Sequence, residues 1–381
     1  MCKLPNKITL QKTALLFLGC IVLGSCNNSK IIPIIDLNKI DQSITLDLTD
    51  ILKDISHIQI STDFLFSVND EVYVTPQYLV IYGGKYSEGA SLDLFSRTGE
   101  HIRKLAARGN GPGEFYSIED FFVDEEDILY YKDMRYRDRL FRIDLANSGA
   151  ALEPLQVDFT YLTTKYLNKK IYSFPNYRGS FTSVNDYPDS AIVAQSTSMP
   201  LGETKKFKGG HTYQYLVLGS SITSYYDEIS LINLGYSDTL FTLKNDKLSP
   251  LCVLKQSNKM TDFSKGGNVI QMISAYQNGI VLSKIKVEYR ESERAQNLTY
   301  LFEYFMLYDR KGTICKIDNT HVLNTNINLT DPEKNYPISS LLPVTCGKYG
   351  YMLVEHDILE NQPANFDPDN DNPILIVGTL K

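Results

Sequence analysis

The glycine-rich segment Arg108-Gly-Asn-Gly-Pro-Gly-Glu-Phe115 contains the residue types of an anion-binding loop. Its glycines allow positive φ angles, so backbone N–H groups could surround an anion, and Arg108 would add positive charge. The segment lacks the Gly-Lys-Ser/Thr ending of nucleotide-binding loops and precedes an expected strand rather than a helix. The sequence favours the alternative, a connection between two sheets in which Phe115 is buried and Glu114 accepts backbone hydrogen bonds. Arg108 and Glu114 are therefore candidate ligand-binding residues with a competing structural role.

A second candidate site is the charged aromatic segment Tyr130-Tyr-Lys-Asp-Met-Arg-Tyr-Arg-Asp-Arg139. Alternate residues of an extended strand share one face, so three arginines of this segment would point the same way. Arginines beside aromatic rings could bind an acidic sugar or a peptide carboxylate. The favoured alternative is a solvent-exposed connection in which neighbouring aspartates pair with the arginines. The candidate ligand-binding residues here are Tyr131, Asp133, Arg135, Tyr136 and Arg137.

Residues suited to metal binding or catalysis do not form a recognisable motif. The segment Asp367-Pro-Asp-Asn-Asp-Asn372 resembles the start of a calcium loop, but Asn372 and Gly378 occupy the positions where an EF-hand needs glycine and an acid. We expect a polar loop there. The five histidines show no metal-ligand spacing, although histidines distant in sequence could converge in the fold. With no Gly-x-Ser-x-Gly motif present, we predict no catalytic residue, no metal and no cofactor.

The first 25 residues have the pattern of an export signal. Three lysines precede the short apolar stretch Thr13–Leu23, which is too short to span a membrane permanently. The ending Leu23-Gly-Ser-Cys26 resembles a bacterial lipobox, which implies cleavage before Cys26 and acylation of its thiol. An ordinary secretory signal is the alternative. We therefore expect a signal peptide over residues 1–25, a tether over 26–40 and the folded domain over 41–381.

Charge and cysteine content narrow the range of partners. Removal of the signal takes away three lysines and no acid, so the net charge changes from −7 to −10. An acidic protein is a poor ligand for nucleic acid or anionic lipid, which both need a basic surface. The remaining cysteines, Cys252, Cys315 and Cys346, lie in apolar or strand-like surroundings, and we expect small buried side chains. Two of them could instead form a disulfide in an exported protein.

The elements that position these residues are predicted by a recurring hairpin, a strand followed by a tight turn and a second strand. Copies start near Leu92, Leu140, Ile192, Leu240 and Phe305, at intervals of 48 to 65 residues. Such a repeat is typical of a β-propeller or β-solenoid with one four-stranded unit per ~40–50 residues. The sequence is rich in tyrosine and β-branched residues and shows no convincing long amphipathic helix. We predict an all-β, six-bladed β-propeller, with five or seven blades as alternatives.

A propeller must close its ring, because an open sheet edge invites aggregation. The apolar C-terminal run Ile374–Leu380 has the composition of a strand in a sheet core. The alternating segment Ile44–Leu48 is the N-terminal strand that we expect to pair with it.

The glycine-rich segment, the lipobox and the final Asn372-Pro-Ile-Leu-Ile strand together resemble bacterial six-bladed β-propeller lipoproteins related to the NHL-repeat class. The resemblance spans about residues 41–381 and implies a cell-envelope protein attached to the outer membrane through Cys26, on its periplasmic or external face. It implies no reaction. We expect a binding or scaffolding module for a glycan, a peptide or an envelope protein. The alternatives are a lyase or hydrolase acting on glycan or peptide at the channel mouth, and a structural partner of an outer-membrane complex.

Overall fold

The strands of the protein form six separate sheets, described here from a computed structural model. Residues 34–381 constitute one compact unit. The structure describes residues 32–85, 87–136, 138–147, 151–156, 163–167, 170–174, 181–185, 191–194, 221–225, 229–233, 238–244, 247–260, 266–276, 279–291, 296–309, 312–322, 325–329, 338–359, 366–367 and 369–381.

The first three sheets are antiparallel four-stranded meanders that follow one another along the chain. The first consists of β4 (Glu71–Val74), β5 (Tyr78–Gly83), β6 (Ser91–Ser96) and β7 (His101–Ala107). The second consists of β8 (Ile118–Val123), β9 (Ile128–Asp133), β10 (Arg139–Asp144) and β11 (Ala151–Gln156). The third consists of β12 (Thr163–Leu167), β13 (Lys170–Phe174), β14 (Phe181–Asn185) and β15 (Ala191–Ala194).

The other three sheets recruit strands from the N-terminal part of the chain. The fourth consists of β16 (Ser221–Tyr225), β17 (Ile229–Asn233), β18 (Thr239–Lys244), β19 (Lys247–Lys255) and β1 (Ile34–Asp36). The fifth consists of β20 (Gly267–Tyr276), β21 (Gly279–Glu291), β22 (Gln296–Asp309), β23 (Ile314–Val322), β24 (Thr325–Asn328) and β2 (Ser43–Asp47). The sixth consists of β25 (Val344–Cys346), β26 (Tyr349–Val354), β27 (Ile374–Leu380) and β3 (Leu52–Gln59).

Helices are short connectors between these strands. They are η1 (Leu37–Lys39), α2 (Leu48–Ile51), α3 (Ile338–Leu341) and η3 (His356–Ile358). Within the described part of the chain, none of the helices has the length and apolar character needed to cross a membrane.

The predicted hairpins are present, and glycine explains the turns of the two clearest copies. Gly99 between β6 and β7 has a φ of 92°, and Gly312 between β22 and β23 has a φ of 87°. Side chains with a Cβ rarely adopt these values, so glycine is needed at both turns. Four of the five predicted starts lie in the third strand of a sheet, whereas Ile192 lies in β15, the fourth strand of the third sheet.

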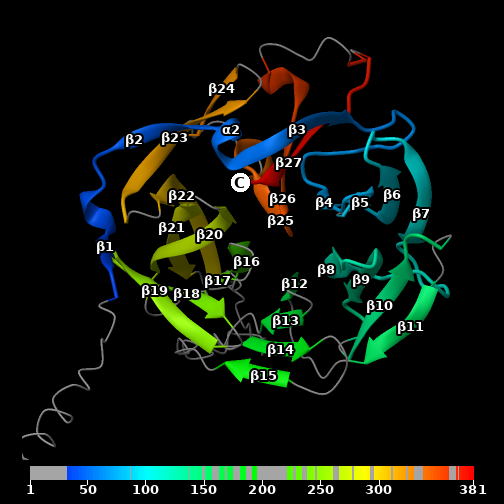
Figure 1. The fold of residues 1–381 in the computed structure, drawn as a ribbon, viewed down its shortest axis with the longest axis horizontal. Helices are drawn as coiled ribbons and strands as arrows, with labels where there is room; N and C mark the ends of the chain where they lie inside the picture. Colours follow the sequence, from blue (N-terminus) through cyan, green and yellow to red (C-terminus); the bar gives the residue numbers. More distant parts are fainter. Residues whose placement is uncertain are drawn as a thin grey trace, which may run out of the picture. The chain divides into compact units, whose positions relative to one another are not determined.

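The first strands of the sheets contact one another in sequence and form a closed ring. Contacts run from β4 to β8, β12, β16, β20 and β25 in that order. The ring closes where the backbone N–H of Val74 in β4 donates to Cys346 Sγ in β25, at 3.2 Å. Figure 1 shows the six sheets around a common centre. The prediction of a six-bladed β-propeller is confirmed.

Apolar side chains fill the spaces between neighbouring blades. One cluster joins the sixth and first blades, a second joins the first and second, and others join the fourth to the fifth and the fifth to the sixth. In the second of these clusters, Tyr82 of β5 meets Phe121 of β8. Burial of each large apolar side chain contributes ~1.5–3 kcal/mol, so packing between blades is a major source of stability.

The ring is closed by the two ends of the chain, as predicted, but a different N-terminal strand closes it. The C-terminal strand β27 pairs antiparallel with β3, with Ile376 opposite His57. The predicted partner, Ile44–Leu48, lies mostly in β2, which pairs parallel with β23. The reason is connectivity, because β3 directly precedes β4 and can reach the first blade through a short link. The strand β1, within the predicted tether 26–40, pairs parallel with β19.

Candidate functional site

The two candidate segments lie side by side at one edge of the propeller. The glycine-rich segment connects β7 to β8, and the aromatic segment forms the β9–β10 turn. Ser117 in the connection accepts a hydrogen bond from the backbone N–H of Met134 in the turn, at 2.9 Å. In an antiparallel meander, blade-to-blade connections and second-to-third-strand turns fall at the same end of the strands. We call this end the loop edge.

The glycine-rich segment forms a connection between two sheets, the alternative that the sequence favoured over an anion-binding loop. Gly113 has a φ of 78°, and the Glu114 side chain accepts a hydrogen bond from the backbone N–H of Gly111 at 2.6 Å. Phe115 is completely buried, and its ring meets Tyr82 edge-on with 5.8 Å between centroids. The segment therefore locks the first blade to the second.

Arg108 is directed toward the preceding turn rather than toward the glycines that follow it. Its guanidinium donates to the backbone carbonyls of Ser87 and Lys85, the second at 2.8 Å. Both carbonyls belong to the β5–β6 turn, which also lies at the loop edge. Arg108 thus ties two loops together, and its charge is partly engaged by these carbonyls.

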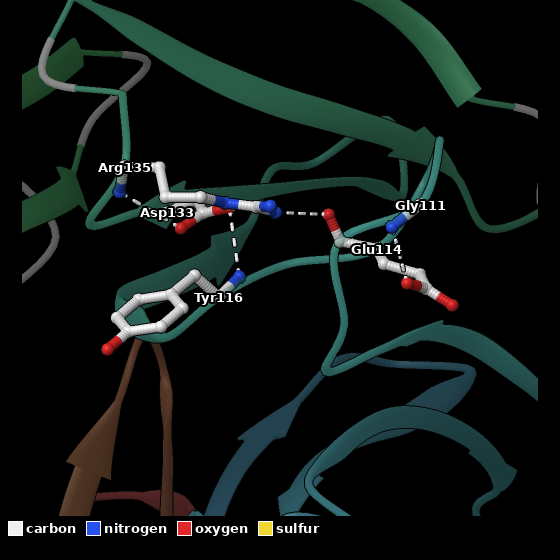
Figure 2. A network of polar contacts seen from close by, with 5 residues as sticks. All are labelled: Gly111, Glu114, Tyr116, Asp133 and Arg135. Atoms are coloured by element: carbon white, nitrogen blue, oxygen red, sulfur yellow. Dashed lines mark hydrogen bonds and ion pairs between the residues drawn. The ribbon is translucent and has the colours of Figure 1, made fainter.

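Asp133 is the centre of the hydrogen-bond network that joins the two segments, which Figure 2 shows. Its carboxylate is 1% exposed and lies 2.8 Å from the guanidinium of Arg135. It also accepts hydrogen bonds from the backbone N–H groups of Tyr116 and Arg135, each at 3.1 Å. Arg135 in turn donates to the backbone carbonyl of Glu114 at 2.6 Å. We refer to Gly111, Glu114, Tyr116, Asp133 and Arg135 as the crossover network.

The arginines of the aromatic segment do not share the face of one strand. The strand β9 ends at Asp133 and β10 begins at Arg139, so Arg135 lies in the turn between them. The expectation of an extended segment was wrong, because the backbone N–H of Tyr136 bonds to the Asp133 carbonyl at 3.0 Å and reverses the chain. Arg137 lies outside the described residues.

The ring of Tyr136 instead contacts two of the arginines. The guanidinium carbons of Arg135 and Arg139 lie 5.5 Å and 5.0 Å from its centroid. Such cation–π contacts fix the ring and the two charges relative to one another. The hydrogen bond to Asp133 also raises the pKa of the Arg135 guanidinium, so this cation persists over the whole range of pH in which proteins are folded.

Tyr131 is a core residue. Its side chain is 5% exposed, and its ring stacks on Phe141 with 5.3 Å between centroids. Burial raises the pKa of Tyr131 to about 12. The ring of Tyr131 therefore belongs to the apolar cluster between the first and second blades.

Three exposed apolar or aromatic side chains project from this frame, and two of them were not predicted. Tyr116 is 58% exposed, Met134 51% and Tyr136 38%. The backbone N–H of Tyr116 donates to the Asp133 carboxylate, and that of Met134 donates to the Ser117 carbonyl, so both residues are fixed at the backbone. We call Tyr116, Met134, Tyr136 and Arg139 the crossover surface. An apolar residue within a polar turn was the only sequence signal for its two unpredicted members.

Three of the five histidines considered above as possible metal ligands are part of the folded sheets and loops. His101 pairs with buried Asp93 at 2.9 Å, His356 lies 2.8 Å from the backbone carbonyl of Asn372, and burial lowers the pKa of His57. His211 falls outside the described residues. Among the residues that are described, no three His, Cys, Asp or Glu side chains form a group able to hold a metal ion.

The cysteines behave largely as expected. Cys252 and Cys346 are buried, whereas Cys315 is half-buried, and all three are thiols. Burial raises the pKa of Cys252 to about 12, which keeps that thiol protonated and unreactive.

A family model described as "6-bladed beta-propeller" matches residues 24–334. The chain belongs to this family, DUF5128. The match includes all of the crossover network and the crossover surface. It begins two residues before Cys26, so this cysteine lies within the matched region. A comparison with curated proteins found no match.

Two solved structures resemble this chain at low sequence identity. A protein from Bacteroides fragilis described as exported is 13% identical, with 89% of this chain and 99% of that one covered and a TM-score of 0.52. BamB from Moraxella catarrhalis is 9% identical, with 86% and 99% covered and a TM-score of 0.37. The likeness to the Bacteroides fragilis protein, at 13% identity, concerns the fold alone.

Proposed function

We propose that this propeller is an outer-membrane lipoprotein, anchored through Cys26, that binds a protein partner at the crossover surface. The observation that carries the proposal is the exposure of Tyr116, Met134 and Tyr136 on a frame of hydrogen bonds centred on the buried carboxylate of Asp133. Tyrosine, methionine and arginine are enriched where proteins contact one another. Because the loops are already fixed, binding would cost little conformational entropy.

The attachment to a membrane rests on the sequence Leu23-Gly-Ser-Cys26. Several acyl chains on one cysteine give stable membrane binding, since each buried methylene adds ~0.8 kcal/mol. The first strand, β1, starts at Ile34, eight positions after Cys26. The partner is accordingly expected among proteins of the cell envelope, and both the periplasmic and the external face are compatible with the proposal.

A protein partner is favoured over a glycan because the exposed side chains combine aromatic, thioether and guanidinium groups. Glycan sites are more often built from aromatic rings with many hydrogen-bonding side chains in a concave pocket. No arrangement in the described part of the chain favours the lyase or hydrolase alternative.

Copurification with matched variants tests the proposal. The tagged full-length protein is purified from detergent-solubilised membranes as the wild type, as Tyr116→Ala/Met134→Ala, and as Ile102→Ala. Ile102 is a suitable control because it is 44% exposed but lies on β7, away from the loop edge. We expect a stoichiometric partner with the wild type and the Ile102 variant, and its loss from the double variant. Equal recovery from all three would contradict the proposal, and recovery of a glycan instead of a protein would change the partner class.

A further inference from the structure

Leu65 occupies an unusual position in the connection between β3 and β4. Its side chain is 89% exposed, the highest value for a large apolar residue in the described part of the chain. Burying a leucine yields ~1.5–3 kcal/mol, so folding gains nothing from this side chain where it stands. The β3–β4 connection joins the last strand of one blade to the first strand of the next, which places Leu65 at the loop edge.

The backbone on both sides of Leu65 is held by one buried side chain. Asn372, 5% exposed, donates from Nδ2 to the Phe64 carbonyl at 2.8 Å and accepts at Oδ1 from the Phe66 N–H at 2.9 Å. The same Nδ2 lies 3.1 Å from the Ser61 carbonyl. The peptide groups flanking Leu65 therefore cannot rotate without breaking hydrogen bonds to the buried side chain of Asn372.

The neighbouring aromatic residues prevent Leu65 from folding inward. Phe66 is 3% exposed and belongs to the cluster between the sixth and first blades. The Phe64 ring packs edge-on against Phe95, with 5.0 Å between centroids, and stacks over His101 at 6.1 Å. With both neighbours directed into the protein, the side chain of Leu65 is fixed toward solvent. It is preorganised for contact and would lose little entropy on binding.

The β3–β4 connection that carries Leu65 meets a second loop, the one before β27, and both contain exposed acidic residues. Gln59 and the backbone of Asp367 exchange two hydrogen bonds, at 2.9 and 3.0 Å, and Asn370 Nδ2 donates to the Ile60 carbonyl at 2.9 Å. These bonds hold the loop before β27 against the β3–β4 connection. Neither segment, 60–70 nor 366–373, contains a lysine, arginine or histidine. The exposed aspartates of the two loops are Asp63, Asp367, Asp369 and Asp371.

We propose that Leu65 and these four aspartates form a second docking surface, which inserts the leucine into an apolar pocket bordered by lysine and arginine on a protein partner. The charge of the rim selects the partner, because opposite potentials attract and like charges repel across an interface. The acidic rim also disfavours an anionic membrane surface as the occupant. This inference goes beyond the proposed function, since it uses different loops and does not depend on the anchor or on the crossover surface.

In-cell photocrosslinking at the exposed residue Thr62, three positions from Leu65, tests the inference. The photoreactive residue p-benzoylphenylalanine replaces Thr62 in the full-length protein, and intact cells are irradiated. The reporter is combined with Leu65→Ser, with Asp369→Asn/Asp371→Asn, or with Glu125→Gln/Glu126→Gln. The last pair removes the same charge from two exposed residues of the β8–β9 turn, at the opposite edge of the second blade, and serves as the control.

We expect one protein adduct that Leu65→Ser reduces at least about tenfold, that the aspartate pair reduces severalfold and that the glutamate pair leaves unchanged. The melting temperature of Leu65→Ser should equal that of the wild type, because the side chain makes no buried contact. The inference is overturned by the absence of an adduct, by an adduct with lipid or glycan, or by one that persists in Leu65→Ser. A melting temperature lowered by several degrees would also overturn it, by giving Leu65 a structural role. If the Thr62 adduct forms but copurification recovers no partner that depends on Tyr116 and Met134, only the proposed function is contradicted.

Discussion

Replacing Asp133 with alanine should lower the free energy of unfolding by about 3 kcal/mol. The carboxylate is 1% exposed and accepts hydrogen bonds from two backbone N–H groups, those of Tyr116 and Arg135, each at 3.1 Å. A buried donor that loses its acceptor costs ~1–3 kcal/mol. The Arg135 side chain, which is 25% exposed, can turn to water, so we count only the two backbone groups, at ~1.5 kcal/mol each.

Thermal unfolding followed by circular dichroism measures this effect. The entropy of unfolding is ~2 cal/mol/K per residue, or ~0.7 kcal/mol/K for a unit of about 350 residues. A loss of ~3 kcal/mol therefore lowers the melting temperature by about 4 °C. Asp133→Asn keeps one acceptor oxygen and should recover part of the loss.

Asp138 provides a matched control from the same turn. It also pairs with an arginine, Arg139, at 3.1 Å, but its side chain is 61% exposed. Exposed ion pairs contribute little, so Asp138→Ala should melt with the wild type. The reasoning is refuted if Asp133→Ala melts within 1 °C of the wild type, or if both aspartate variants lose the same stability.

Four further predictions concern the anchor, the glycine-rich segment, a buried acid and ring closure. Cys26→Ser should move the protein from the membrane fraction to the soluble fraction, and unchanged fractionation would contradict lipidation. Gly113→Ala should lower the free energy of unfolding by ~1 kcal/mol, because alanine is strained at a φ of 78°. No atom lies within 4 Å of an added Cβ, so no clash adds to this backbone strain. An unchanged midpoint of urea unfolding would exclude the strain. Burial raises the pKa of Asp70 to about 6, above its ordinary 3.8, so the folded protein binds this proton more tightly than the unfolded chain. Urea titrations should therefore show the wild type gaining ~2 kcal/mol relative to Asp70→Asn as the pH falls from 7 to 4, and parallel pH profiles would argue against it. A chain starting at residue 61 lacks β3 and should aggregate, whereas one starting at residue 34 should remain monomeric in light scattering; two monodisperse products would show that β3 is dispensable for closure.

Local features of the fold could be predicted from the sequence because they depend on neighbouring residues. Alternation and glycine spacing identified the hairpins, and both Gly99 and Gly312 have the positive φ that their turns need. The structural alternative for the glycine-rich segment followed from the same kind of pattern. Phe115 is buried and Glu114 bonds to the backbone of Gly111, within three residues.

The closing strand could not be predicted by pattern alone. Both β2 and β3 have strand-like sequences, so alternation does not distinguish them as partners of β27. The choice depends on which of them can connect directly to β4, and this is a property of the whole ring.

The crossover network was also beyond sequence analysis. Asp133 lies between Lys132 and Met134 in a segment whose charged residues predict exposure to solvent. Its carboxylate is nevertheless buried, and it accepts a hydrogen bond from the backbone N–H of Tyr116, 17 residues away. The same connection forces Tyr116 outward. Apolar residues are expected inside a protein, so the exposure of Tyr116 and Met134 is visible only once the loops are placed.

The central claim, that the loop edge is where the propeller binds its partner, is tested most directly by comparing two crosslinking positions in the second blade. Photoreactive p-benzoylphenylalanine replaces Tyr116 at the loop edge in one strain and exposed Glu126, in the β8–β9 turn at the opposite edge, in another. We predict a discrete protein adduct from position 116 in intact cells and none from position 126. Adducts of equal yield from both positions, or an adduct from position 126 alone, would contradict the assignment of the binding face.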